Sequence, residues 1–137
     1  MVKEETKLWQ KLSDNTKHHV HWTRLESWAL PGVPDLYGIK EGRSFWVELK
    51  VHRLKSLNSL KLSPHQINWQ VQHCAHGGSV WNLVSHPPSR TTNLFSGKRA
   101  LELGGMTEKE GPLKPDRRWQ SPINWSRMIE IMMKNEC

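Results

Sequence analysis

The stretch GVPDLYGIKEGRSFWVELKV, residues 32–51, decides the fold of this chain. Its second half, SFWVELKV at 44–51, is dense in β-branched and aromatic residues, which predicts a strand. A shorter apolar segment at 36–39 precedes it, and Glu41-Gly42 between the two is typical of a turn. We therefore expect a β-hairpin in the middle of the protein.

Three charged residues of this hairpin suggest chemistry. Side chains alternate along a strand, so Glu48 and Lys50 share one face and Leu49 points into the core. Asp35 stands at the start of the first strand, where the hairpin can bring it close to Glu48. Two convergent carboxylates favour a hard cation such as Mg²⁺ or Mn²⁺, and Lys50 can orient or deprotonate a water. We expect Glu48 and Lys50 to be exposed side by side.

Taken singly, these residues have ordinary explanations. A Glu-x-Lys on a strand is usually a solvated ion pair, and an Asp after a proline most often forms a turn. Their combination on adjacent strands, followed by a basic segment, favours a functional site.

The rest of the chain predicts further helices and strands around this hairpin. A mixed α/β (α+β) fold follows, in which a central mixed β-sheet is flanked by helices. The expected elements are a helix at 4–13, a strand at 20–26, a loop at 52–62, a helix that Ser63-Pro64 opens and Gly77-Gly78 ends, strands at 80–84 and, at an edge, 91–95, a long loop or arm at 104–120, and a helix capped by Ser121-Pro122.

The chain of 137 residues suits one domain, with a core at 1–103. Residues 104–137 add an arm and an amphipathic helix, which belongs to the same core or to a dimer interface. The start of the chain has no apolar segment of the secretory kind, no stretch is long enough to span a membrane, and two cysteines cannot form a disulfide scaffold, so a cytoplasmic location is expected.

Positive charge is concentrated in the middle of the chain. The formal net charge is +7, and no acidic residue lies between Glu48 and Glu102. A segment of one sign favours a surface that binds a polyanion, with nucleic acid more expected than a membrane. A basic surface that only aids solubility is the alternative.

Residues 32–51, together with Ser63-Pro64-His65-Gln66, resemble the PD-(D/E)XK nucleases, closest to small phage-type members of the VRR-NUC and Holliday-junction-resolvase-like group. The resemblance covers roughly residues 20–85 and implies a restriction-endonuclease-like core. It implies that Asp35, Glu48 and the Leu49 carbonyl hold Mg²⁺, for which Mn²⁺ can substitute, and that Lys50 is the catalytic lysine. It also implies an upstream glutamate.

For this upstream position we choose Glu26, and Glu5 is the rival. A salt bridge with Arg24 is the ordinary explanation for Glu26. Gln66 corresponds to the glutamine of the group and is expected to hold the lysine or a phosphate. An ordinary surface glutamine is the alternative.

The function expected from this resemblance is a metal-dependent DNA endonuclease, structure-specific for branched DNA and working as a homodimer. The alternatives are a DNA-binding module without catalysis and a nuclease that acts on RNA or plain duplex DNA. Expected DNA contacts are Arg53, Lys55, Lys61, Gln66, Lys98 and Arg99.

Other conspicuous residues have structural explanations. The histidines lack the spacing of a zinc site and are expected at the surface or in packing, with phosphate contacts as the alternative. On the helix after Pro64, the buried stripe should be Ile67, Val71, Cys74 and Ala75. Trp69 falls on the polar face with Gln66 and Gln70, where packing against the long loop or a partner is favoured over stacking on DNA.

Overall fold

The computed structural model describes residues 4–25, 30–105 and 111–137. Within these ranges six strands form one sheet, in the order of the chain: β1 (His21–Arg24), β2 (Leu36–Lys40), β3 (Arg43–Val51), β4 (Val80–His86), β5 (Thr91–Ser96) and β6 (Arg117–Trp119). The α-helices of the described residues are α1 (Glu4–Thr16), α2 (Pro64–Ala75), α3 (Ala100–Leu103) and α4 (Trp125–Lys134).

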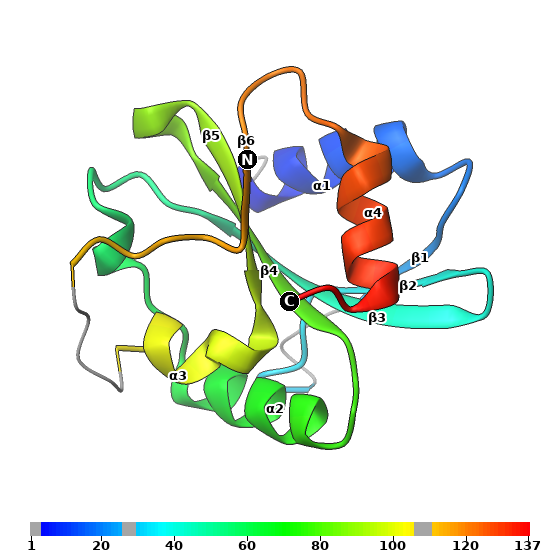
Figure 1. Ribbon diagram of the computed structural model, residues 1–137, viewed down its shortest axis with the longest axis horizontal. Helices are drawn as coiled ribbons and strands as arrows, with labels where there is room; N and C mark the ends of the chain where they lie inside the picture. The colour runs from blue at the N-terminus through cyan, green and yellow to red at the C-terminus, as the bar shows by residue number, and fades with distance from the viewer. Residues whose placement is uncertain (1–3, 26–29, 106–110) are drawn as a thin grey trace.

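The sheet is mixed because one pair of neighbouring strands runs parallel. Strands β3 and β4 are parallel and are joined by the crossover through α2, whereas every other pair is antiparallel. Helices α1 and α4 lie on one face of the sheet and α2 and α3 on the other (Figure 1). The expected mixed sheet flanked by helices is thus confirmed. Among the described residues, no helix has the length and apolar character needed to cross a membrane.

The larger core lies between the sheet and the pair α1 and α4. Alternate residues of β3 (Phe45, Val47 and Leu49) meet the apolar side chains of both helices there. The apolar face of α4 forms part of this core, and Met128, Ile129 and Met132 are almost completely buried. Helix α4 therefore closes the core of its own chain, which leaves these three side chains unavailable to a partner.

A second core lies under α2 and α3, on the opposite face. It is built from Leu57, Leu60, Leu62, Ile67, Val84, Phe95, Ala100, Leu103 and Leu113. The loop after β3 supplies the first three of these, so it is fixed to the domain by buried leucines. This anchoring matters because the loop connects β3 to the first turn of α2.

Several expected boundaries were wrong. The segment 104–120, expected as a loop, contains β6, which pairs with β5. Strand β5 is therefore an interior strand, and all of its residues are buried. Helix α4 is capped by Asn124, whose side chain accepts a hydrogen bond from the Arg127 amide, and begins after the expected Ser121-Pro122.

The buried face of α2 also differs from the expectation. Gln70 is completely buried, whereas Ala75 is exposed. The reason is that Gln70 has a polar partner on the sheet, as described below.

Candidate active site

The β2–β3 hairpin brings Asp35 to Glu48, as its turn predicted. Leu36 pairs with Val47, so the same register places Asp35 opposite Glu48. Asp35 Oδ2 accepts a hydrogen bond of 2.9 Å from the Leu49 amide, and the Asp35 carbonyl accepts one of 2.7 Å from the Leu25 amide. Asp35 is therefore fixed where the ends of β1, β2 and β3 meet.

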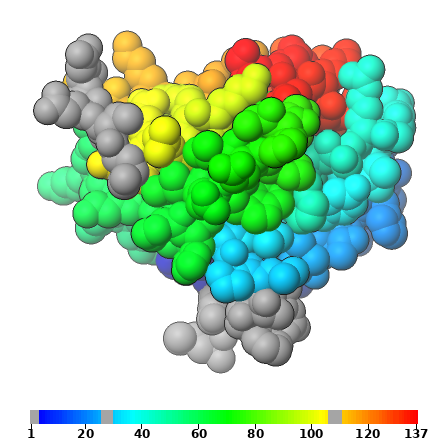
Figure 2. Space-filling model, turned by 90° about the horizontal axis from the view of Figure 1, so that it is seen from below, coloured from blue at the N-terminus to red at the C-terminus, as the bar shows by residue number. Residues whose placement is uncertain are grey.

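The segment that leads into β2 lies directly against the first turn of α2. A Cβ on Gly32, which has a φ of +86°, would stand 2.3 Å from the carbonyl oxygen of His65. In Figure 2 the surface of the segment before β2 (light blue to cyan) adjoins that of α2 (green). Glycine at this position therefore allows α2 to approach the segment that carries Asp35.

Glu48 is buried, contrary to the expectation that it would be exposed. Only 6% of the residue is accessible, because α2 covers this face of β3. Burial, and then the like charge of Asp35, raise the pKa of Glu48 to about 9, although the Lys50 ammonium acts in the opposite direction. Two carboxyl groups so arranged repel each other unless one is protonated or a cation lies between them.

Gln66 connects the glutamate to the lysine. Its Nε2 donates to Glu48 Oε2 at 3.1 Å, and its Oε1 accepts from Lys50 Nζ at 3.3 Å. The same Oε1 accepts from the Ser63 amide at 2.9 Å, while Ser63 Oγ accepts from the Gln66 amide, which makes a capping box at the start of α2. The helix cap therefore fixes the amide that holds both candidate catalytic groups.

A pair of amides, which sequence reasoning missed, lies next to Glu48. Asn82 on β4 is in register with Glu48, and its side chain exchanges two hydrogen bonds of 2.8 Å with that of Gln70. Both residues are completely buried. The available signal was the single asparagine within the otherwise apolar strand segment VWNLV, facing a helix with a glutamine one turn after Gln66.

The donor set of this site fits a hard divalent cation. Asp35 and Glu48 supply carboxylate oxygens, and their repulsion would be relieved by positive charge. No group of three or more His, Cys, Asp or Glu that could hold a metal ion occurs within 4–25, 30–105 and 111–137. Glu26 lies outside the described residues, and its rival Glu5 is exposed on α1. The role of the Leu49 carbonyl stays a prediction.

The basic segment does not form one continuous surface. Lys55 and Lys61 are exposed in the loop that follows β3, close in sequence to Lys50. Arg53 is also exposed there and forms an ion pair with Glu4. Lys98 is exposed but follows β5, which runs antiparallel to β4, so it lies toward the opposite end of the sheet.

Arg99 has a structural role. Its guanidinium donates to Glu102 at 3.0 Å, to Asp116 at 3.3 Å and to the Lys114 carbonyl. These contacts tie α3 to the segment before β6 and occupy the side chain. The expected DNA contact of Arg99 stays a prediction, and it would compete with these intramolecular contacts.

Comparison with known proteins is informative about the fold. No protein-family model and no curated protein matches this chain. Among solved structures, it is similar to Hjc, a Holliday junction resolvase from the archaeal hyperthermophile Archaeoglobus fulgidus, with a TM-score of 0.52 and 18% sequence identity over 78% of this chain and 83% of that one. The chain thus has a mixed α+β fold similar to that of this resolvase.

Proposed function

We propose that this protein is a divalent-metal-dependent DNA endonuclease that cleaves branched DNA. Its active site would be formed by Asp35, Glu48 and Lys50. The observation that carries the proposal is the connected site in which Gln66 bonds both Glu48 and Lys50 while Asp35 lies opposite Glu48. The buried carboxyl group of Glu48, beside the partly buried carboxyl of Asp35 and an ammonium, is expensive to maintain for stability alone. Phosphodiester hydrolysis gives each of these groups a use.

The residues of this site have separable roles. Asp35 and Glu48 would hold Mg²⁺, which neutralises charge on the scissile phosphate and lowers the pKa of a bound water. Gln66 orients the Glu48 carboxylate by donating to Oε2. The same amide positions the Lys50 ammonium, which can then orient the attacking water or neutralise the phosphate.

Branched DNA is the substrate that the fold similarity to Hjc supports best, because that protein is a Holliday junction resolvase. The charge of the chain agrees with a polyanionic partner, and Lys55 and Lys61 lie exposed after the strand that carries Lys50. Glu48 and Asp35 argue for cleavage rather than DNA binding alone, since a binding module gains nothing from two carboxylates near the phosphate.

The experiment is a cleavage assay on labelled four-way junction, flap, duplex and RNA, with Mg²⁺ or with a chelator. We expect Mg²⁺-dependent cleavage that is fastest on the branched substrates. Glu48→Gln should lower the rate by at least about 100-fold, because it removes a carboxylate that would hold the divalent ion. DNA affinity of this variant, measured by fluorescence anisotropy, should be unchanged or higher, because a negative charge near the phosphate is gone.

The matched control is Glu41→Gln, the same change in the exposed turn between β2 and β3, which should cleave as the unmodified protein does. Cleavage by Glu48→Gln at the full rate would refute the assigned site. DNA binding without cleavage of any substrate would favour a binding module. If RNA or plain duplex were cleaved fastest, that nucleic acid would be the substrate in place of branched DNA.

A further inference from the structure

Four aromatic rings lie beside the candidate active site, on the same face of the sheet. We call Tyr37, Trp46, Trp69 and His73 the aromatic cluster. Tyr37 stands two residues after Asp35 on β2, and Trp46 stands two residues before Glu48 on β3, so each shares a sheet face with its acidic neighbour. Trp69 stands about one turn after Gln66 on α2. The cluster therefore begins next to Asp35 and Glu48 and continues between the sheet and α2.

The rings of the cluster contact one another in a continuous series. Tyr37 meets Trp46 at 4.7 Å between centroids, and Trp46 meets Trp69 at 5.1 Å, both edge to face. Trp69 and His73 are stacked at 4.5 Å with an angle of 11° between their planes. The place of Trp69 on the polar face of α2 predicts packing against the long loop or a partner. The structure shows instead that it packs on Trp46 and His73.

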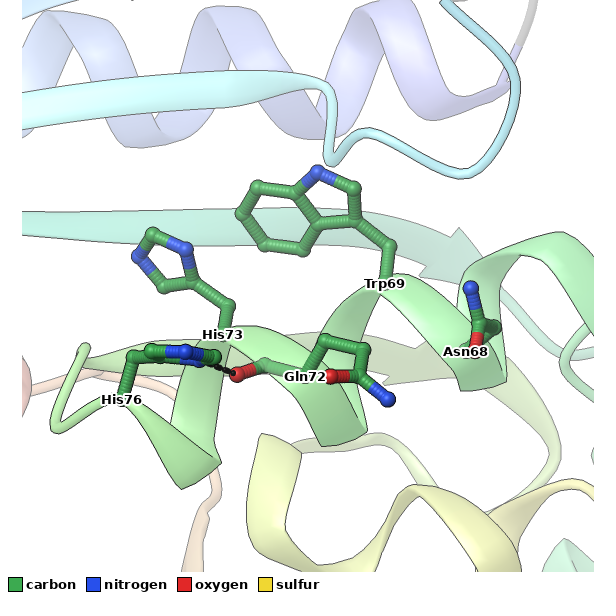
Figure 3. Close-up of a pocket in the computed structure, with 5 residues that line it drawn as sticks. All are labelled: Asn68, Trp69, Gln72, His73 and His76. Atoms are coloured by element: carbon green, nitrogen blue, oxygen red, sulfur yellow. Dashed lines mark hydrogen bonds between the residues drawn. The ribbon is translucent and has the colours of Figure 1, made fainter.

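An open pocket of about 250 Å³ adjoins the stacked pair, and it is lined by Asn68, Trp69, Gln72, His73 and His76. Figure 3 shows Trp69 and His73 projecting from the same side of α2, with Gln72 and His76 along the neighbouring face. Both aromatic residues are only partly buried. The pocket thus combines aromatic walls with the side-chain amides of Asn68 and Gln72.

This combination suits a small, flat and polar-edged group. Aromatic side chains bind nucleobases by stacking, at roughly 1–3 kcal/mol per base, and amides can hydrogen-bond the base edges. Burial and the neighbouring His76 lower the pKa of His73, which favours the uncharged ring. The pocket is smaller than the roughly 300 Å³ at which sites for drug-sized ligands begin, so one ring system is a suitable occupant.

We infer that this pocket receives one unpaired nucleobase of the DNA strand that is presented to Asp35 and Glu48. The inference rests on the proposed function, because it names a feature of the substrate bound next to that site. Bases inside a duplex are stacked on both faces and cannot enter, whereas a base at a branch point or in a single strand can. The aromatic cluster would thus make the enzyme prefer DNA with unpaired bases.

The test measures DNA binding without a divalent metal, so that no cleavage occurs. Fluorescein-labelled oligothymidylate and a labelled blunt-ended duplex of two annealed strands serve as probes in fluorescence anisotropy. Trp69→Leu keeps an apolar side chain but removes the aromatic face, and it should weaken oligothymidylate binding by about tenfold. Trp69→Phe should restore most of the affinity. Binding of the duplex should be unchanged in both variants.

The matched control is Trp125→Leu, the same change in a partly buried tryptophan of α4 on the other face of the sheet, and it should not affect oligothymidylate binding. A second readout is an oligonucleotide with one 2-aminopurine, whose fluorescence the unmodified protein should quench and Trp69→Leu should not. Thermal unfolding verifies that each variant is folded.

Equal oligothymidylate affinities of Trp69→Leu and Trp69→Phe would overturn the inference, because the residue would then act only in packing. Equal losses on oligothymidylate and duplex, or no binding of oligothymidylate by the unmodified protein, would overturn it as well. A stacking effect in a protein that cleaves no substrate with Mg²⁺ would refute the proposed nuclease and leave the base-binding pocket standing.

Discussion

Glu48 shows how a single residue can oppose stability and support chemistry. Its carboxyl group is buried between Asp35 and Lys50, and one of its oxygens accepts from Gln66. Without a cation, burial and the Asp35 charge favour the protonated form of Glu48. A divalent ion between the carboxylates would favour the ionised form, so metal binding should release a proton at neutral pH.

The first prediction concerns the pH dependence of stability in a chelator. The pKa of Glu48 is about 9 in the folded chain, against 4.5 as its ordinary value. The unfolded chain therefore loses this proton first as the pH rises, and the stabilisation that is complete below pH 4.5 is lost progressively toward pH 9. Glu48→Gln cannot ionise, so it should unfold at a higher temperature than the unmodified protein at pH 8, with a small difference at pH 5.

Calorimetry or circular dichroism at the two pH values measures this difference, which should exceed about 1 kcal/mol at pH 8. Added Mg²⁺ should stabilise the unmodified protein and not Glu48→Gln. A difference between the two proteins that does not change with pH would contradict the assigned ionisation of Glu48.

The sequence predicted which residues of the site would meet, but not how deeply they would be buried. Strand alternation placed Glu48 and Lys50 on one face, and the turn at Glu41-Gly42 brought Asp35 opposite Glu48. Glu48 was nevertheless expected to be exposed, because a strand pattern does not reveal which helix covers its polar face. Gln66 was identified through the family resemblance, and its hydrogen bonds to Glu48 and Lys50 became visible only in three dimensions.

Among the elements, α2 contributes several of the side chains that lie around the candidate active site. It presents Gln66 to Glu48 and Lys50, Gln70 to Asn82, and Trp69 to the pocket beside them. Ser63 and Pro64 specify where the helix begins, and the capping box places Gln66 in its first turn. The two hydrogen bonds between Gln70 and Asn82 then hold α2 against β4.

The second prediction tests this amide pair by a double-mutant cycle. Gln70→Leu or Asn82→Leu alone leaves one buried amide without its partner and should lower the free energy of unfolding by about 1–3 kcal/mol. The double variant removes both amides and should recover part of that loss, because an apolar pair needs no hydrogen bond. Urea unfolding measures the four free energies.

The two losses would add without recovery if the amides were independent, and that result would contradict the coupling. Asn15→Leu at the exposed end of α1 is a control for the chemical change and should cost far less.

Elements with strong local patterns were predictable, and those fixed by distant partners were not. The strand at 44–51 and the helix after Ser63-Pro64 carry their own apolar periodicity and cap. Strand β6 has three residues, Arg117–Trp119, within a stretch without periodicity, and it exists because β5 offers an open edge. The apolar spacing of α4 predicted a helix, but its start was placed too early, at Ser121-Pro122. The helix begins after Asn124, whose side chain provides the cap.

At the scale of the whole molecule, positive charge is divided between two ends of the sheet. Lys55 and Lys61 follow β3 near the candidate active site, whereas Lys98 follows β5 toward the opposite end. A segment without acidic residues in the sequence is thus not a single surface in the fold. The contacts expected from Lys55 and Lys61 fit DNA at the active site, and a contact from Lys98 would require DNA that extends along the protein.

A symmetric assembly follows from the proposed substrate. Resolution of a four-way junction needs two incisions, and each chain offers one Asp35–Glu48 pair, so we expect two copies related by a two-fold axis. The buried apolar face of α4 belongs to the core of its own chain, so a partner contact would use another surface. Paired incisions would be the functional sign of this dimer.

The most direct test of the account is the incision pattern on a four-way junction with labels on each strand, followed under single-turnover conditions in Mg²⁺. We predict two symmetrically placed incisions in opposite strands. Lys50→Ala should slow both by at least about 100-fold, while Lys134→Ala, an exposed lysine of α4, should leave the rate unchanged. No incision with either Mg²⁺ or Mn²⁺, or an equal rate for Lys50→Ala, would contradict the account.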